Sequence, residues 1–255
     1  EAGVRELERE TAAVCRKAAM DIGSGKARVR VGKQKLAAYL GAPKYTHGAI
    51  DAINEIGLAN GLAWTSFGGE TLQIEVQIVP GSGQVILTGK LGDVMQESAK
   101  AALTFIKAHA EEFGITLPLD KKDIHLHVPE GAVPKDGPSA GITIMTAMLS
   151  ALSDIPARAD TAMTGEITLR GRVLEIGGLR EKLLAAYRAG IKRVLIPKAN
   201  EKDLSDVPDE VKANMEIIGV ASAFDVIPLA LEHTPQKTAD AFIPQHAHSG
   251  AAAAQ

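Results

Sequence analysis

The sequence predicts a mixed α/β (α+β) domain that is preceded by a small helical appendage. Three observations support this prediction. Residues 71–79 alternate apolar and polar side chains, as a half-buried strand does. Residues 161–197 have the pattern of a strand, a helix and a second strand in the order of a βαβ unit. Residues 1–20 carry apolar side chains among many charges, which is typical of an amphipathic surface helix.

Composition limits the class of protein. With 255 residues, of which 45% are apolar and 23% charged, the chain can bury a sizeable core. A net charge of −3 provides no positive electrostatic potential that would attract nucleic acid. The single Cys15 excludes an internal disulfide framework and fits a reducing compartment. Because no apolar stretch reaches ~18 residues and no signal-peptide pattern occurs, we expect a cytoplasmic protein without a membrane partner.

The appendage is expected to contain two helices. The first covers residues 1–20 and ends at the Gly-Ser-Gly sequence of residues 23–25. The second covers Lys33–Leu40 and is stopped by Gly41, with Pro43 close behind. Since the chain starts at Glu1 without a methionine, we expect it to be part of a longer protein.

The next segment is expected to hold a β-hairpin. Residues 63–67 and 71–79 have strand patterns, residues 80–83 form a turn, and residues 84–88 return alongside the second strand. A helix is expected over residues 95–113.

Two histidines lie on one face of the strand that is expected over residues 123–128. His125 and His127 could bind a metal ion, but the spacing places no third ligand. We therefore expect no metal site, and we expect these histidines to line or support the loop that follows.

The loop GAVPKDGPSAG, at residues 131–141, leads into an apolar run at residues 142–152. Glycine and proline predict an irregular loop, Pro138 suits the first helical position, and the run predicts a buried helix. Ser139 would then lie at a helix N-terminus, where free N–H groups and the helix dipole can stabilise an oxyanion. The small Ala140 leaves room for a substrate carbonyl. The alternative is that Ser139 only caps the helix.

A serine nucleophile needs a base, and Lys182 is the candidate. It falls in a helix expected from about Leu179 to Gly190, among three alanines beside the core face. Such surroundings disfavour the ammonium, and a pKa lowered from about 10.4 to about 7–8 corresponds to roughly 4 kcal/mol. A neutral lysine can accept the serine proton. The alternative is that Lys182 extends over the alanines to water.

The remaining pattern predicts further alternation of strands and helices. The expected elements are a loop (153–160), a strand (161–169) with its return (172–176), a strand (193–196), a charged turn (201–209), a short strand (216–220) and a closing helix (223–231).

The Ser139 loop and the segment TGEITLRGRVLEIGGLREKLLAA, at residues 164–186, together resemble the proteolytic domain of the Lon family of ATP-dependent proteases. The resemblance extends over GLAWT (61–65), GGE (68–70), TGK (88–90), LGDVMQESA (91–99), HLHVPEG (125–131) and IKRVLIP (191–197). It implies a Lon-type Ser-Lys protease domain, a serine endopeptidase of protein quality control. Ser139 would be the nucleophile, Lys182 the general base, and Thr164 the residue that orients the lysine.

The resemblance also implies supporting positions. Around the dyad these are Asp136, Gly137, Pro138 and Ala140. We further consider that Asp136 contacts Lys182 in a resting state and holds the site inactive. One departure is Glu175, where the family commonly has proline; a carboxylate close to the lysine would raise its pKa and oppose its role as base.

Other positions are candidates for binding. Trp64, Glu130 and Gly131 would line the substrate groove, although Trp64 is equally compatible with a half-buried core aromatic. Arg5 stands where the family has a nucleotide-sensing arginine, although a helical arginine is more often a solvated surface charge.

The resemblance divides the chain into four parts. Residues 1–45 would be the remnant of a helical ATPase subdomain, 46–58 a linker, 59–234 the proteolytic domain and 235–255 a disordered tail. No GxxxxGK[ST] motif occurs, so no cofactor is expected in this chain, and ATP and Mg²⁺ are expected to act only in the full-length protein.

Expected partners are unfolded or damaged proteins and further copies of the chain, in a hexamer. We expect no nucleic-acid partner. The alternative function is an assembly and substrate-holding module with a latent active site. A Ser-Lys amidase acting on small molecules is disfavoured, because no SxxK signature surrounds the serine.

Overall fold

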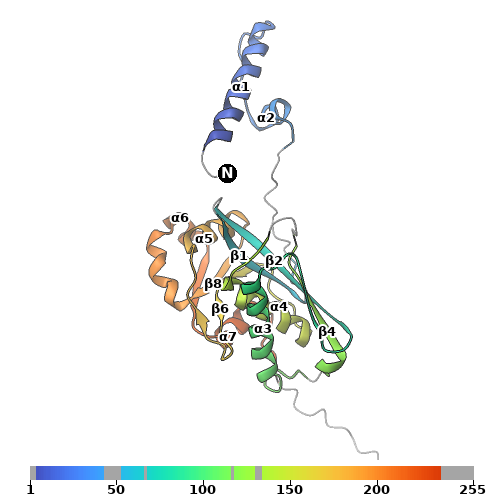
Figure 1. The fold of residues 1–255 in the computed structure, drawn as a ribbon. Helices are drawn as coiled ribbons and strands as arrows, with labels where there is room; N and C mark the ends of the chain where they lie inside the picture. The colour runs from blue at the N-terminus through green and yellow to red at the C-terminus, as the bar shows by residue number, and fades with distance from the viewer. Residues whose placement is uncertain (1–3, 43–52, 66–67, 116–117, 130–133, 237–255) are drawn as a thin grey trace, which may run out of the picture.

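One mixed β-sheet organises the protein. The computed structural model describes residues 4–42, 53–65, 68–115, 118–129 and 134–236 (Figure 1). Seven strands follow one another in the order β3-β4-β2-β1-β5-β8-β9, and a separate pair is formed by β6 and β7. Their bounds are β1 Leu58–Thr65, β2 Gly68–Pro80, β3 Val85–Thr88, β4 Lys122–His127, β5 Thr161–Met163, β6 Glu166–Ile167, β7 Val173–Leu174, β8 Arg193–Pro197 and β9 Glu216–Val220.

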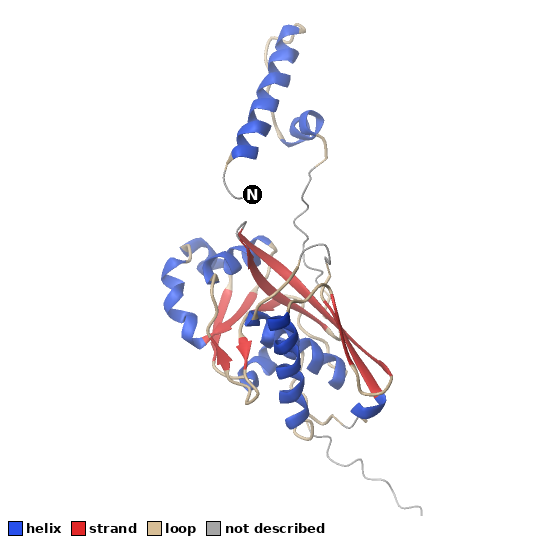
Figure 2. Cartoon of the chain, in the orientation of Figure 1, coloured by secondary structure: helices blue, strands red, loops and turns tan. Residues whose placement is uncertain are grey.

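The described residues form seven α-helices, of which α3 to α7 pack beside the twisted sheet while α1 and α2 form the appendage (Figure 2). They are α1 Arg5–Gly23, α2 Lys33–Leu40, α3 Asp93–Ala108, α4 Gly141–Ser153, α5 Leu179–Arg188, α6 Asp209–Asn214 and α7 Ala223–Ala230. Segments of 3-10 helix cover Leu119–Lys121, Pro138–Ala140 and Lys198–Asp206. None of these helices, within the described part of the chain, has the length and apolar character needed to cross a membrane.

The strand alternation builds two separate cores. On β8, Leu195 contributes to one core, while Val194 and Ile196 contribute to the other, because successive side chains point to opposite faces. The first core contains residues of α3, α4 and α7 and the second contains residues of α5 and α6. The sheet therefore separates α4 from α5, and groups from its two sides can meet beyond the end of the interior strand β5, where Thr164 follows directly.

The predicted hairpin between residues 71–79 and 84–88 is wrong. β3 pairs in parallel with β4, which lies between it and β2, and the true hairpin joins β1 and β2, with Thr65 opposite Gly68. The Asp123 carboxylate on β4 accepts the N–H groups of Ser82 and Gln84, each at 2.8 Å, and so directs the turn toward β4.

Several other boundaries differ from the predictions. The helix expected over 95–113 covers Asp93–Ala108, and the strand expected over 63–67 covers Leu58–Thr65. The expected strand 161–169 is interrupted after Met163, because the N–H of Gly165 donates to the Ser139 carbonyl instead of continuing the sheet. The charged turn over 201–209 forms part of a 3-10 segment followed by α6. The predictions of α2, of β9, of the closing helix and of a buried helix after the central loop are confirmed.

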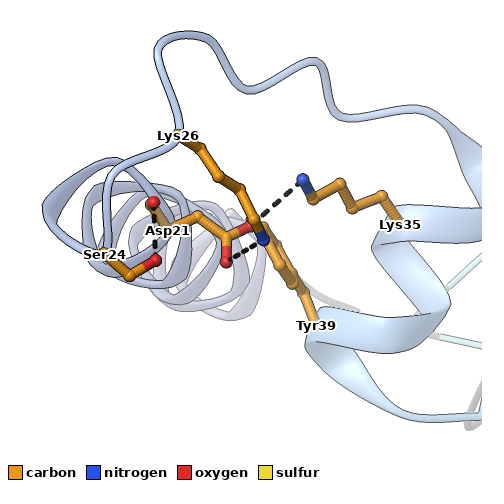
Figure 3. A network of polar contacts seen from close by, with 5 residues as sticks. All are labelled: Asp21, Ser24, Lys26, Lys35 and Tyr39. Atoms are coloured by element: carbon orange, nitrogen blue, oxygen red, sulfur yellow. Dashed lines mark hydrogen bonds and ion pairs between the residues drawn. The ribbon is translucent and has the colours of Figure 1, made fainter.

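The appendage is held by polar contacts rather than by an apolar core. α1 buries no residue, and α2 buries only Tyr39. Figure 3 shows the Asp21 carboxylate of α1 facing Lys26, Lys35 and Tyr39, which we call the Asp21 network. Hydrogen bonds from Lys26, Tyr39 and Lys35, in that order of strength, hold the pKa of Asp21 well below its usual range.

Candidate active site

Ser139 lies where the central loop enters α4. Pro138–Ala140 forms a 3-10 turn with the proline at its start, and α4 continues from Gly141. From Gly141 to Ser150 every residue of α4 is buried, so the serine is attached to a rigid element of the core. No side-chain hydrogen bond caps the 3-10 turn or α4, so the interpretation of Ser139 as a simple helix cap is wrong.

The backbone of Ser139 is fixed from the segment that follows β5. Its carbonyl accepts the N–H of Gly165 at 2.8 Å and the hydroxyl of Thr164 at 3.2 Å. The N–H of Ile142 in turn donates to the Gly165 carbonyl at 3.1 Å. Gly165 was not among the predicted site residues. Its place beside Thr164 in the TGE sequence is the signal that could have indicated it.

Lys182 reaches the serine from α5. Gly178 begins the helix with φ 69°, a left-handed conformation that glycine adopts at little cost, and its carbonyl accepts the N–H of Lys182. The lysine side chain is only 2% exposed. Its Nζ lies 3.0 Å from Ser139 Oγ and 3.0 Å from Thr164 Oγ1. The alternative in which Lys182 extends to water is therefore wrong.

Burial sets the electrostatics of the lysine. It lowers the pKa of Lys182 from 10.5 to about 8, because the ammonium is removed from water. At 1.36 kcal/mol per unit, the penalty on the charged form is roughly 3 kcal/mol. Glu175 does not offset this, because its carboxylate pairs with Lys202 Nζ at 3.0 Å among exposed side chains. The concern that Glu175 raises the pKa of the lysine is not supported.

Asp136 has a different partner from the one predicted. Its Oδ1 accepts the N–H of Met95 at 3.0 Å and the N–H of Gly137 at 2.8 Å. It therefore occupies the N-terminus of α3, where a carboxylate is favourable, and it does not contact Lys182. The proposed resting-state contact is wrong in this structure, and Asp136 instead ties the Ser139 loop to α3.

Trp64 lies on β1 with 56% of its surface exposed, so it is not a half-buried core residue. It covers the start of α5 closely: a Cβ added to Gly178 would lie 2.7 Å from Trp64 Cγ. Its predicted place in a substrate groove stays a prediction. Glu130 and Gly131 lie outside the described residues.

The two histidines of β4 have a structural partner. Thr88 Oγ1 lies 3.0 Å from His125 Nε2 and 2.7 Å from His127 Nδ1, so they join β3 to β4. Among the described residues, no group of three or more histidine, cysteine and carboxylate side chains is placed to hold a metal ion. Arg5 is exposed at the first position of α1, and its nucleotide contact stays a prediction.

Comparison with known protein families gives two matches. Residues 30–233 match the model of the Lon protease (S16) C-terminal proteolytic domain, and residues 1–31 match that of the Lon protease AAA+ ATPase lid domain.

Curated relatives agree with these matches. The chain is 57% identical over 235 residues to the Lon protease of Nitratidesulfovibrio vulgaris, covering 91% of this chain and 29% of that relative. It is 54% identical over 233 residues to Lon protease 1 of Myxococcus xanthus, covering 91% and 28%. With the Lon protease of Brucella suis it shares 51% identity over an alignment of 263 residues, covering 100% and 32%. The chain thus spans less than a third of the length of these relatives.

Proposed function

Because the chain belongs to the Lon protease family and carries its C-terminal proteolytic domain, we propose that it cleaves polypeptides with Ser139 as nucleophile and Lys182 as general base. One observation carries this assignment. A lysine that is 2% exposed holds its Nζ 3.0 Å from the hydroxyl oxygen of a serine. Hydrogen-bond distance between a nucleophile and a base is the geometry that nucleophilic catalysis requires.

The lowered pKa makes the lysine competent as a base near neutral pH. With a pKa of about 8, roughly one-tenth of Lys182 is neutral at pH 7, against about three in ten thousand at 10.5. Only the neutral amine has the lone pair that can accept the Ser139 proton. Activity is therefore expected to rise with pH through the titration of Lys182.

The reaction then follows from the positions of the two side chains. The Ser139 hydroxyl transfers its proton to Lys182 Nζ as Oγ attacks the peptide carbonyl carbon. The lysine ammonium returns the proton to the leaving amine nitrogen, and an acyl-enzyme remains. Water attacks this ester with Lys182 again accepting the proton, and the ammonium then returns that proton to Ser139 Oγ as the ester C–O bond breaks and the peptide acid leaves. Backbone N–H groups near Ser139 would stabilise each oxyanion, at roughly 3 kcal/mol per donor.

Thr164 supports both residues of the dyad. Its hydroxyl accepts from Lys182 Nζ and donates to the Ser139 carbonyl, so one fully buried side chain orients the base and fixes the nucleophile's backbone. A group that acts between base and nucleophile in this way completes the arrangement expected for an activated serine.

The activity of the whole protein is part of the proposal. We propose that the full-length protein degrades unfolded or damaged proteins as a homohexamer in the cytoplasm, with ATP and Mg²⁺ bound outside this proteolytic domain. We also propose that residues 1–45 end the ATPase module, that 46–58 link it to residues 59–234, and that 235–255 form a tail. A latent, misaligned dyad is not favoured by a separation of 3.0 Å between Nζ and Oγ.

Hydrolysis of an unstructured fluorogenic peptide tests the proposal. The unaltered chain, Ser139→Ala and Lys182→Ala would be assayed from pH 6 to 10, with the oligomeric state of each fraction measured by sizing. The proposal predicts activity that rises through one titration and is lost in both variants. An active Lys182→Ala, or an assembled but inactive unaltered chain, would reject the dyad as assigned.

A further inference from the structure

The hairpin of β1 and β2 lies directly against the helix that carries Lys182. Trp64, near the end of β1, covers Gly178 at the start of α5. Opposite Trp64 in the hairpin is Gly69, whose carbonyl accepts a hydrogen bond from Arg188 Nη2 at 3.0 Å. Arg188 is the last residue of α5. The hairpin therefore contacts α5 at both of its ends.

Between these two contacts, Gly69 approaches the α5 backbone closely. A Cβ added to this buried glycine would lie 2.0 Å from the Glu181 carbonyl oxygen, 2.4 Å from its carbonyl carbon and 3.0 Å from Lys182 N. The obstacle is helix backbone rather than the flexible end of a side chain. Only glycine can occupy this position without separating the hairpin from α5.

We propose that Gly69 is a positioning residue for Lys182: its missing side chain lets the hairpin clamp α5 at the turn that delivers the lysine to Ser139. This inference rests on the proposed function for its catalytic meaning. The clamp itself is a statement about backbone contact, and it can be tested without any measurement of peptide cleavage.

The sheet explains why this contact fixes the lysine relative to its partners. β1 pairs in parallel with β5, with Gly61 opposite Met163, and Thr164 follows directly after β5. The hairpin and Thr164 are thus parts of one hydrogen-bonded framework. Holding α5 against the hairpin holds Lys182 Nζ at the distance from Thr164 that the structure has.

The size of the steric conflict gives the expected effect. Returning the Cβ to 3.0 Å from the Glu181 oxygen, the shortest contact that real structures tolerate, requires the two backbones to separate by about 1 Å. A misplacement of about 1 Å can lower catalysis on the order of 10²-fold. A displaced α5 also admits water to the lysine, which restores the hydration of the ammonium.

The pKa of Lys182 therefore reports whether the β1–β2 hairpin still holds α5 in place. This pKa is lowered by burial, and the carboxylates of Glu175 and Asp136 are engaged elsewhere, with Lys202 and with the α3 backbone. Within α5, Glu181 is the adjacent carboxylate, and it remains in every variant. A rise in the pKa of Lys182 toward 10.5 would thus mean loss of burial.

The experiment uses the full 255-residue chain, labelled with ¹³C at its lysine side chains. The Lys182 signal is assigned by its absence in Lys182→Met and is followed from pH 6 to 11. Gly69→Ala is compared with Gly32→Ala, a matched methyl addition in open space on extended backbone. Arg188→Met removes the hydrogen bond to the Gly69 carbonyl while keeping an unbranched stem.

The expected result is a raised Lys182 pKa in Gly69→Ala, a kcat lower by about 10²-fold, little change in KM, and unaltered behaviour of Gly32→Ala. Arg188→Met should move both quantities in the same direction by a smaller amount. If Gly69→Ala folds and keeps the original Lys182 pKa and kcat, the proposed clamp is wrong, because the added methyl group would then have moved the hairpin and not α5. If Gly69→Ala does not fold, an unchanged Lys182 titration in Arg188→Met overturns it. Absence of cleavage in every variant would reject the proposed function, while the titration would still decide the clamp.

Discussion

Replacing Thr164 by valine removes one hydroxyl from the centre of the site and keeps the shape of the side chain. That hydroxyl accepts from Lys182 Nζ at 3.0 Å and donates to the Ser139 carbonyl at 3.2 Å. Because Thr164 is fully buried, the change leaves an N–H of the lysine without its acceptor. The penalty is larger for the ammonium than for the neutral amine, so the pKa of Lys182 should fall further.

The size of the fall in the Lys182 pKa follows from how strongly the Thr164 hydroxyl binds the charged and the neutral forms of the lysine. Hydrogen bonds to charged groups contribute about 1.5–3 kcal/mol and neutral ones about 0.5–1.5, a difference of about 1 kcal/mol. At 1.36 kcal/mol per unit this is roughly 0.7 of a pKa unit. The midpoint of the pH profile should therefore move from about 8 to roughly 7. Loss of orientation should lower the maximal rate by about tenfold, equal to roughly 1.4 kcal/mol.

The assay is peptide hydrolysis by Thr164→Val, Thr164→Ser and the unaltered chain over the same pH range. The serine variant keeps the hydroxyl and should keep the midpoint, which separates the hydrogen bond from the loss of a methyl group. A midpoint that is unchanged or higher in Thr164→Val would refute the reasoning, because the lysine would then have found another acceptor or water.

Three further predictions concern stability. Lys182→Met should abolish cleavage but raise the free energy of unfolding at pH 7 by up to roughly 3 kcal/mol. The pKa of Lys182 is about 8 in the folded chain and 10.5 in the unfolded chain, so the gain in stability should be full below pH 8 and disappear by about pH 10.5. Denaturant titrations at several pH values measure this gain. Asp136→Ala should cost about 1 kcal/mol by thermal melting through loss of the α3 cap and should lower kcat/KM, whereas faster cleavage would revive a resting-state role. Asp21→Asn should accelerate hydrogen exchange across α1 and α2 with unchanged peptide cleavage, and unchanged exchange would exclude the Asp21 network as their main link.

Local sequence chemistry predicted the elements that carry the dyad. The glycine- and proline-rich loop followed by an apolar run indicated a buried helix with Ser139 at its start, and α4 has that form. Alanines beside Lys182 indicated a lysine near the core, and it is buried. The Lon resemblance depended on the same residues, and the family is confirmed by the match over residues 30–233.

Contacts between distant segments could not be read in the same way. Asp136 was predicted to face Lys182, but its actual partner is the N–H of Met95, 41 residues earlier in the chain. The pairing of a short strand such as β3 depends on which other strands the fold brings beside it. β3 pairs with β4, whereas the expected hairpin required pairing with β2.

The sequence by itself determined which residue types are present for the chemistry and on which helices they lie, because caps, breakers and periodicity act over a few residues. Only the tertiary structure decided that Lys182, 43 residues beyond Ser139, stops 3.0 Å from its hydroxyl. It also decided that a glycine of the β1–β2 hairpin touches the backbone beside that lysine. Both facts depend on how closely two packed backbones approach, and that distance is set by the whole core rather than by any local pattern.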